Sequence, residues 1–114
     1  MGLKKINIVL IVGTAMIVSH CSSNFYIPTS LQISYAKEIW PEADSAYLLR
    51  GYNLYVNKCG GCHYLYKPDS YKPERWNKVL PIMRDKAKLN EEEYNCINRY
   101  IQALSNTDIK TKYE

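Results

Sequence analysis

The chain has 114 residues, of which 46% are hydrophobic and 23% are charged. Its formal net charge of +4 falls to +2 without the segment 1–20, whose only charged side chains are Lys4 and Lys5. So small a basic surplus gives no reason to expect binding to nucleic acid.

The N-terminal segment 1–20 has the pattern of an export signal. Lys4 and Lys5 precede an apolar stretch over residues 6–18, which is too short for an ordinary transmembrane span. Cys21 follows directly, and this arrangement resembles the processing site of bacterial lipoproteins, although His20 stands where that pattern has a small residue. The resemblance implies a signal peptide over residues 1–20, a lipid on Cys21, and a membrane-anchored protein on the periplasmic side. The alternative is an ordinary signal peptide or an uncleaved anchor, with Cys21 incidental.

The next segment, residues 21–43, shows no sustained hydrophobic period. We therefore expect an extended, lipid-anchored tether there. Apolar and polar residues alternate briefly over 31–35, which suits a short strand, but no partner strand follows. We place the folded domain at residues 44–105 and a flexible tail at residues 106–114.

The first helix of that domain is predicted over about residues 46–58, with Asp44 or Ser45 as its cap. Apolar residues recur there at spacings of three and four, which is typical of a helix with one buried face. The residues of this face are Tyr47, Leu48, Gly51, Leu54 and Tyr55.

A Cys-x-x-Cys-His run follows, formed by Cys59, Cys62 and His63. This run is the attachment signature of c-type haem, in which two thiols add to the vinyl groups and the histidine binds the iron. A redox dithiol would need a βαβ setting, and no strand-like alternation lies nearby. A zinc site needs about four ligands, and only Cys96 could be the fourth, although it also suits a small core position.

Two further helices are predicted after the run. One begins near Pro73, and Pro81 inside it should kink or divide it. The other opens at Asn90 with Glu93 three residues later, as in a capping box, and ends near Ser105. A domain as short as 44–105 makes a marginal core unaided, so a covalent haem would also supply apolar surface for these helices.

With these elements, residues 44–105 resemble a small monohaem cytochrome c domain. The likeness rests on the Cys-x-x-Cys-His run, on residues 51–55 before it, on Met83, and on an apolar stripe in the closing helix. The stripe consists of Ile97, Tyr100, Ile101 and Leu104. The resemblance implies an all-α, three-helix domain wrapped around one covalently attached haem c, in which Gly51 lets the closing helix approach.

The resemblance also implies His63 as the proximal ligand and Met83 as the distal ligand. Six-coordinate iron has no open position, so the expected role is transfer of single electrons between redox partner proteins. No enzymatic activity and no small-molecule substrate are expected.

Two alternatives remain open. Met83 follows His63 at a short distance in the sequence, at helical spacing with Trp76, and also fits a plain core position. In that case lysine, water or no group would stand opposite His63, and the chain would be a high-spin sensor of small gaseous ligands. The second alternative is a haem subunit that passes electrons to a separate catalytic chain.

Overall fold

The computed structural model describes residues 26–106 and 108. Within this part of the chain all regular structure is helical, and no strand occurs. The elements in order are α1 (Ser30–Ile39), α2 (Ser45–Leu54), the π-helical turn η1 (Tyr55–Cys59), the 3-10 turn η2 (Pro68–Ser70), α3 (Pro73–Lys86) and α4 (Glu91–Ser105). The predicted all-α class is confirmed for the described residues. Three of their four α-helices lie in the predicted domain 44–105, and α1 precedes it.

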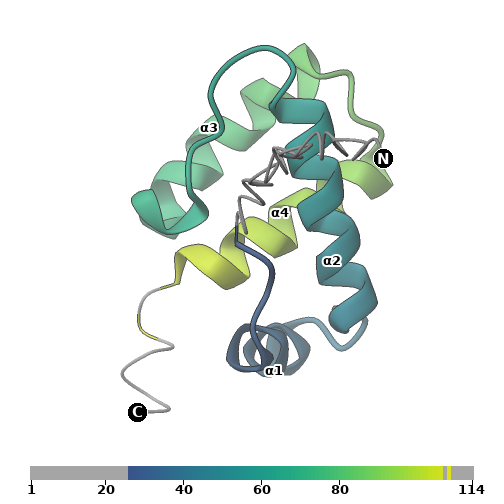
Figure 1. The fold of residues 1–114 in the computed structure, drawn as a ribbon, viewed down its shortest axis with the longest axis vertical. Helices are drawn as coiled ribbons and strands as arrows, with labels where there is room; N and C mark the ends of the chain where they lie inside the picture. The colour runs from purple at the N-terminus through teal and green to yellow at the C-terminus, as the bar shows by residue number, and fades with distance from the viewer. Residues whose placement is uncertain (1–25, 107, 109–114) are drawn as a thin grey trace, which may run out of the picture.

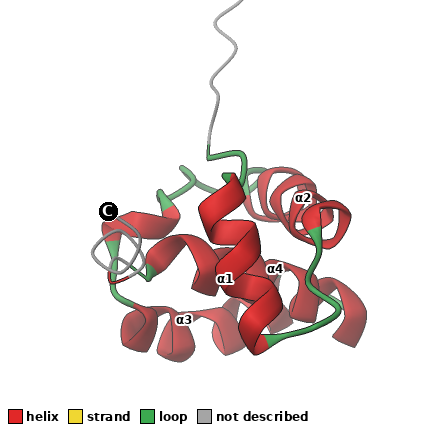
Figure 2. Ribbon diagram, turned by 90° about the horizontal axis from the view of Figure 1, so that it is seen from below, coloured by secondary structure: helices red, strands yellow, loops and turns green. Residues whose placement is uncertain are grey.

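Helix α4 is the central element of the fold. It contacts α1, α2 and α3, and the two ribbon views place α2 on one side of it and α3 on the other (Figures 1 and 2). Its side chains Ile97, Tyr100 and Ile101 are completely buried, as are those of Cys96 and Ala103. The apolar stripe predicted for the closing helix is therefore the middle of the core.

The additional helix, α1, lies in the segment that we expected to be an extended tether. Its start is a capping box, in which Gln32 N–H donates to the Thr29 hydroxyl and Thr29 N–H donates to Gln32 Oε1 at 2.8 Å. Ala36 is completely buried, and α1 contacts α4. The short strand suggested for residues 31–35 is therefore wrong, and the packed part of the chain begins before residue 44.

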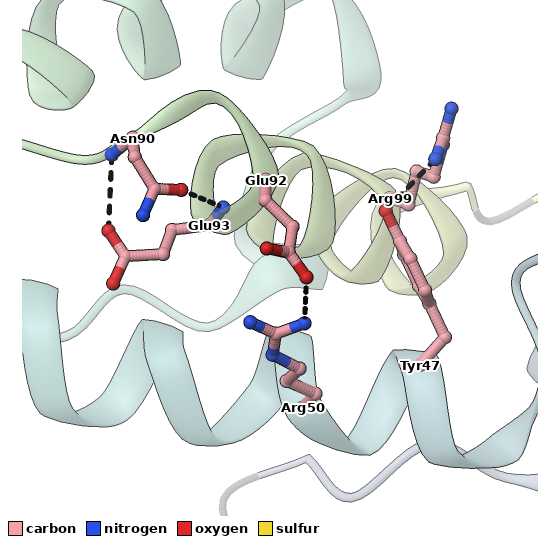
Figure 3. Close-up of polar contacts among 6 residues, drawn as sticks. All are labelled: Tyr47, Arg50, Asn90, Glu92, Glu93 and Arg99. Atoms are coloured by element: carbon pink, nitrogen blue, oxygen red, sulfur yellow. Dashed lines mark hydrogen bonds and ion pairs between the residues drawn. The ribbon is translucent and has the colours of Figure 1, made fainter.

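Helices α2 and α4 approach each other at Gly51. A Cβ built on Gly51 would lie 2.7 Å from Cβ of Tyr100 and closer still to the carbonyl oxygen of Cys96. Arg50 and Glu92 form an ion pair across the same helices (Figure 3). Because both of these side chains are largely exposed, the pair contributes little, and close backbone packing is the stronger contact.

The predicted helix starts are confirmed. Asp44 accepts a hydrogen bond from Tyr47 N–H at 2.8 Å and so caps α2. Asn90 and Glu93 form the predicted capping box at the start of α4, with bonds of 2.9 and 3.1 Å (Figure 3). Figure 3 also shows Arg99, whose guanidinium donates to the Tyr47 hydroxyl at 2.9 Å.

Helix α3 is continuous through Pro81, so of the predicted kink or division, the division did not occur. Trp76 and Leu80 before Pro81 are buried in the core, and this packing holds the helix together despite the missing N–H. The helix ends in a Schellman motif, in which Leu89 N–H donates to Arg84 O at 3.0 Å. The intervening Lys88 has a φ of 52°, in the left-handed region.

Several predictions lie outside the described residues. They are the signal peptide at residues 1–20, the lipid on Cys21, and the tail positions 107 and 109–114. Across the described residues, no helix combines the length and apolar character that a membrane span requires.

Candidate functional site

The Cys-x-x-Cys-His run begins where α2 ends. The π-helical turn η1 extends α2 to Cys59, and Gly60 N–H then donates to Val56 O at 3.2 Å. A turn follows and carries Cys62 and His63 to the surface, where both are exposed. Cys59 and Cys62 are not in disulfide bonds, so both thiols are available for thioether bonds to a haem.

The thiols differ in their surroundings. Cys59 is partly buried whereas Cys62 is exposed. Burial, with a smaller effect from Cys62, raises the pKa of the Cys59 thiol. Cys59 therefore anchors the inner edge of the site and Cys62 its outer edge.

The imidazole of His63 is held in one tautomer. Its Nδ1 lies 2.8 Å from the carbonyl oxygen of Tyr64. A carbonyl only accepts, so in the neutral imidazole Nδ1 carries the proton and Nε2 has the lone pair. Metal-binding histidines usually donate their second N–H to such an acceptor, and His63 is therefore prepared to coordinate iron through Nε2.

A pocket of about 220 Å³ brings the predicted haem residues together. Its lining comes from η1, from the run and from the C-terminal end of α3 with its cap: Lys58, Cys59, Cys62, His63, Met83, Lys86 and Ala87. Met83 is partly exposed and is not among the buried core residues. The α3 residues that do enter the core are Trp76 and Leu80, so the interpretation of Met83 as plain core loses support.

A second hollow lies beside the same run. It is open, has a volume of about 620 Å³, and shares Cys62 and His63 with the first pocket. Tyr64 at its edge is 95% exposed. Both sides of the run are thus accessible to a flat ligand, and a haem fits the donor set of two thiols, an imidazole and a thioether.

Two hydrogen bonds fix the loop after the run. Tyr55 Oη donates to the Tyr66 carbonyl at 2.5 Å, and Trp76 Nε1 donates to the Pro68 carbonyl at 2.8 Å. Burial raises the pKa of Tyr55 far above its ordinary value, so its phenol remains a donor. Because Trp76 gives its single N–H to Pro68, it is not available to a haem propionate.

Aromatic rings form a row from the run to the core. The ring centroids are 6.1 Å apart for His63 and Tyr66, 5.5 Å for Tyr66 and Tyr71, and 5.7 Å for Tyr71 and Trp76. From Trp76 the row continues to Tyr55, Tyr100 and Tyr52. Sequence reasoning missed this row, because its members are separated along the chain and only the fold brings them together.

The zinc alternative loses its fourth ligand. Cys96 is completely buried in α4, and its carbonyl faces Gly51. In the range 26–106 and at residue 108, no three His, Cys, Asp or Glu side chains gather closely enough to hold a metal ion. Cys96 is therefore a small core residue, as one of the two interpretations had it.

A family model described as "Dihaem cytochrome c" matches residues 55–114, which is more than half of the chain. The chain belongs to the dihaem cytochrome c family. This cytochrome therefore carries c-type haem, and the match spans the Cys-x-x-Cys-His run, α3 and α4. No curated protein and no solved structure matches the chain.

The family name introduces one difference from the prediction. The family is described as dihaem, whereas the 114 residues contain a single Cys-x-x-Cys-His run. The haem cofactor and the class of cytochrome agree with the prediction. One haem per chain remains a prediction.

Proposed function

We propose that this cytochrome carries single electrons on one haem c, which Cys59 and Cys62 would bond covalently and His63 and Met83 would hold through its iron. The supporting observation is the pocket that all four side chains line. When bound, the haem iron supplies the chemistry by cycling between its ferric and ferrous forms. The cytochrome is an electron carrier, not itself an enzyme.

The residues of the chain set the properties of that carrier. The hydrogen bond from His63 Nδ1 to the Tyr64 carbonyl orients the imidazole and increases its basicity. The soft thioether of Met83 favours the ferrous form and raises the reduction potential relative to a harder ligand. Because His63 and Met83 would both hold the iron, no coordination position would be left for a substrate, which favours electron transfer over gas sensing.

The test of the ligand assignment is Met83→Ala in protein exported with the haem-attachment machinery. We expect the variant to keep covalent haem but to lose the weak far-red band of oxidised methionine-ligated cytochromes. Ile82→Ala is the matched control, because Ile82 is the preceding residue of α3 and is 55% exposed; it should keep the band. A colourless wild-type protein would contradict the haem assignment, and a high-spin wild-type spectrum would favour the sensor.

A second candidate function follows from the number of haem motifs. A single run in a family described as dihaem suits a haem subunit that works with another haem-bearing or catalytic chain. Co-purification of the exported protein under mild conditions tests this. A stable complex would favour the subunit. A haem-loaded monomer that exchanges electrons without another chain would favour the independent carrier.

We also propose that the protein is exported and anchored on the periplasmic side through a lipid on Cys21. The support is the short apolar stretch that ends at this cysteine. Cys21→Ser should release the protein from the membrane fraction, and the intact mass should fall by the mass of the lipid while the haem mass remains. Unchanged fractionation would contradict the anchor without affecting the haem assignment.

A further inference from the structure

Charge is distributed unevenly over this cytochrome. Residues 55–90, from η1 to the end of the turn after α3, hold eight basic and three acidic side chains, a surplus of +5. The other described residues, 26–54, 91–106 and 108, hold three basic and seven acidic side chains, which gives a net charge of −4. The positive part of the molecule is therefore the part that contains the haem-attachment run.

The exposed side of α3 gathers much of this positive charge. At 3.6 residues per turn, Arg75, Val79, Ile82 and Lys86 fall in one row along the helix, with Lys78 beside it. The three basic residues and Ile82 are exposed, and Val79 is partly exposed. We call these five residues the α3 basic face; it has charged ends and an apolar centre.

The charges of this face are not neutralised within the described part of the chain. Arg75, Lys78 and Lys86 make no ion pair there, whereas Lys58 pairs with Glu93 and Arg99 with Glu42. Arg75 lies over the ring of Tyr71, 4.1 Å from its centroid, which holds the guanidinium in place while leaving its charge unpaired.

The acidic residues of α3 lie away from the site. By helical spacing, Glu74 and Asp85 lie on the flank of the helix opposite to that of Met83. The α3 basic face therefore has the acidic side chains Glu74 and Asp85 along one edge and the haem pocket along the other.

The α3 basic face adjoins the haem site at two places. Lys86 lines the pocket that contains Met83 and His63. Arg75 and Val79 line a neighbouring pocket of about 170 Å³ together with Tyr66, whose ring centroid is 6.1 Å from that of His63. A molecule seated on this face would therefore lie next to the haem.

We propose that the α3 basic face is the docking surface for an acidic redox protein that carries a one-electron metal centre. This inference rests on the electron-transfer function proposed above. Opposite charges steer such partners together, whereas a small apolar centre lets the complex dissociate after each encounter. With haem bound, one electron would pass from its ferrous iron to the oxidised metal centre of the partner, and no bond would form or break and no proton would move.

The first experiment measures how fast the reduced, full-length protein is oxidised by two inorganic probes of opposite charge. Ferricyanide, an anion, should react faster at low ionic strength, and the tris(phenanthroline)cobalt(III) cation should react more slowly. Lys78→Glu should slow the ferricyanide reaction roughly three- to ten-fold at low salt and accelerate the cobalt reaction.

The matched control is Lys37→Glu, which makes the same charge change at an exposed position of α1. It should leave both rates within about two-fold of wild type. The far-red band should be unchanged in both variants, which shows that the haem site is intact. Equal effects of Lys78→Glu and Lys37→Glu would overturn the proposal, because only net charge would then matter.

The second experiment does not depend on electron transfer. Poly-glutamate added to the isotope-labelled ferrous protein should shift the backbone amide resonances of α3 but not those of α1, and Lys78→Glu should reduce the shifts. If the α3 amide resonances shifted with phosphatidylglycerol vesicles but not with poly-glutamate, the α3 basic face would be a membrane-binding surface. That result would overturn the proposal. A protein without covalent haem would contradict the proposed function, whereas a haem-loaded protein without charge preference would contradict only this inference.

Discussion

Trp76 connects the loop after the haem-attachment run to the core. Its indole N–H donates to the Pro68 carbonyl, and its ring meets Tyr71 on the loop side and Tyr55 on the core side. The loop between η1 and α3 has only the short turn η2 as regular structure. A few side-chain contacts of this kind therefore determine where the loop lies.

Trp76→Phe should lower the free energy of unfolding by about 2–3 kcal/mol. The smaller ring leaves a gap, and the buried Pro68 carbonyl loses its donor. Denaturant unfolding measures the change. Trp40→Phe is the control, since Trp40 is only partly buried and its ring nitrogen has no hydrogen bond to a described residue; a loss as large as that of Trp76→Phe would contradict this account.

The proposed haem residues could be predicted from the sequence because they are neighbours along the chain. Cys59, Cys62 and His63 lie within one short run, so their spacing alone suggested an attachment site. The bond between Tyr55 and the Tyr66 carbonyl was not predictable, because it joins residues 11 positions apart through an irregular loop. The place of Met83 lies between these cases: the resemblance suggested its role, and only the fold puts it in the pocket with His63.

The contact between α2 and α4 depends on the absence of a side chain at Gly51. Ala is about 1 kcal/mol more favourable than Gly inside a helix, but its Cβ would meet the backbone of Cys96 and the Cβ of Tyr100. The backbone of Cys96 cannot move aside as a flexible side chain could. The cost of steric overlap in Gly51→Ala is therefore larger than the gain from the higher helix propensity of alanine.

Gly51→Ala should therefore destabilise the protein by about 1–3 kcal/mol in denaturant unfolding. Gly61→Ala is the matched control, because the nearest atom to its Cβ would be Asn57 O at 4.0 Å, an ordinary contact. If the two variants were equally stable, close helix approach at Gly51 would not be the constraint.

A residue just after the end of α3 shows the opposite situation: it has a side chain at a position where the backbone conformation favours glycine. Lys88 adopts the left-handed conformation that closes the Schellman motif. Lys88→Gly should stabilise the protein by roughly 0.5–1 kcal/mol, measured as a higher denaturant midpoint. Lys86→Gly, within the last turn of α3, should instead destabilise it by about 1 kcal/mol; a gain there would exclude backbone conformation as the cause.

Three of the four α-helices in the described part of the chain were predictable from apolar spacing and caps, and α1 shows why the fourth was not. Thr29 and Gln32 did carry a helix-start signal. The alternation over residues 31–35 pointed to a strand, and the burial of Ala36 against α4 depends on tertiary packing that local pattern does not reveal. For α3, core packing likewise overrode the break expected at Pro81.

Across the whole molecule, tyrosines take the place that phenylalanine often has in cores. The chain has eleven tyrosines and one phenylalanine. Tyr100 is completely buried and donates its hydroxyl to the Tyr26 carbonyl at 2.9 Å, and Tyr55 holds the Tyr66 carbonyl in the same way. The buried phenols thus supply apolar area and also bind irregular backbone to the helices.

This arrangement predicts sensitivity to alkali. Burial raises the pKa values of Tyr55 and Tyr100 in the folded protein, whereas tyrosines of the unfolded chain ionise near pH 10. Above about pH 10 the unfolded state therefore binds fewer protons, and the free energy of unfolding should fall by up to about 1.4 kcal/mol per pH unit for each phenol. Denaturant unfolding at a series of alkaline pH values measures this slope.

Tyr100→Phe should make that slope shallower, although it also removes the bond to the Tyr26 carbonyl. Tyr64→Phe is the matched control, because this phenol is 95% exposed, and it should keep the wild-type slope. An unchanged slope in Tyr100→Phe would show that other groups cause the alkaline loss of stability.

The row of rings also determines what happens to absorbed light. Excitation of the tyrosines can pass from ring to ring to Trp76, because successive centroids in the row are only 5.5–6.4 Å apart. Trp76 is three rings from His63 along the same row, so a haem bound there would accept this energy before it is emitted. The intrinsic fluorescence of Trp76 should therefore be dim in the haem-loaded protein and bright in unloaded chains, which provides an internal optical reporter of haem attachment.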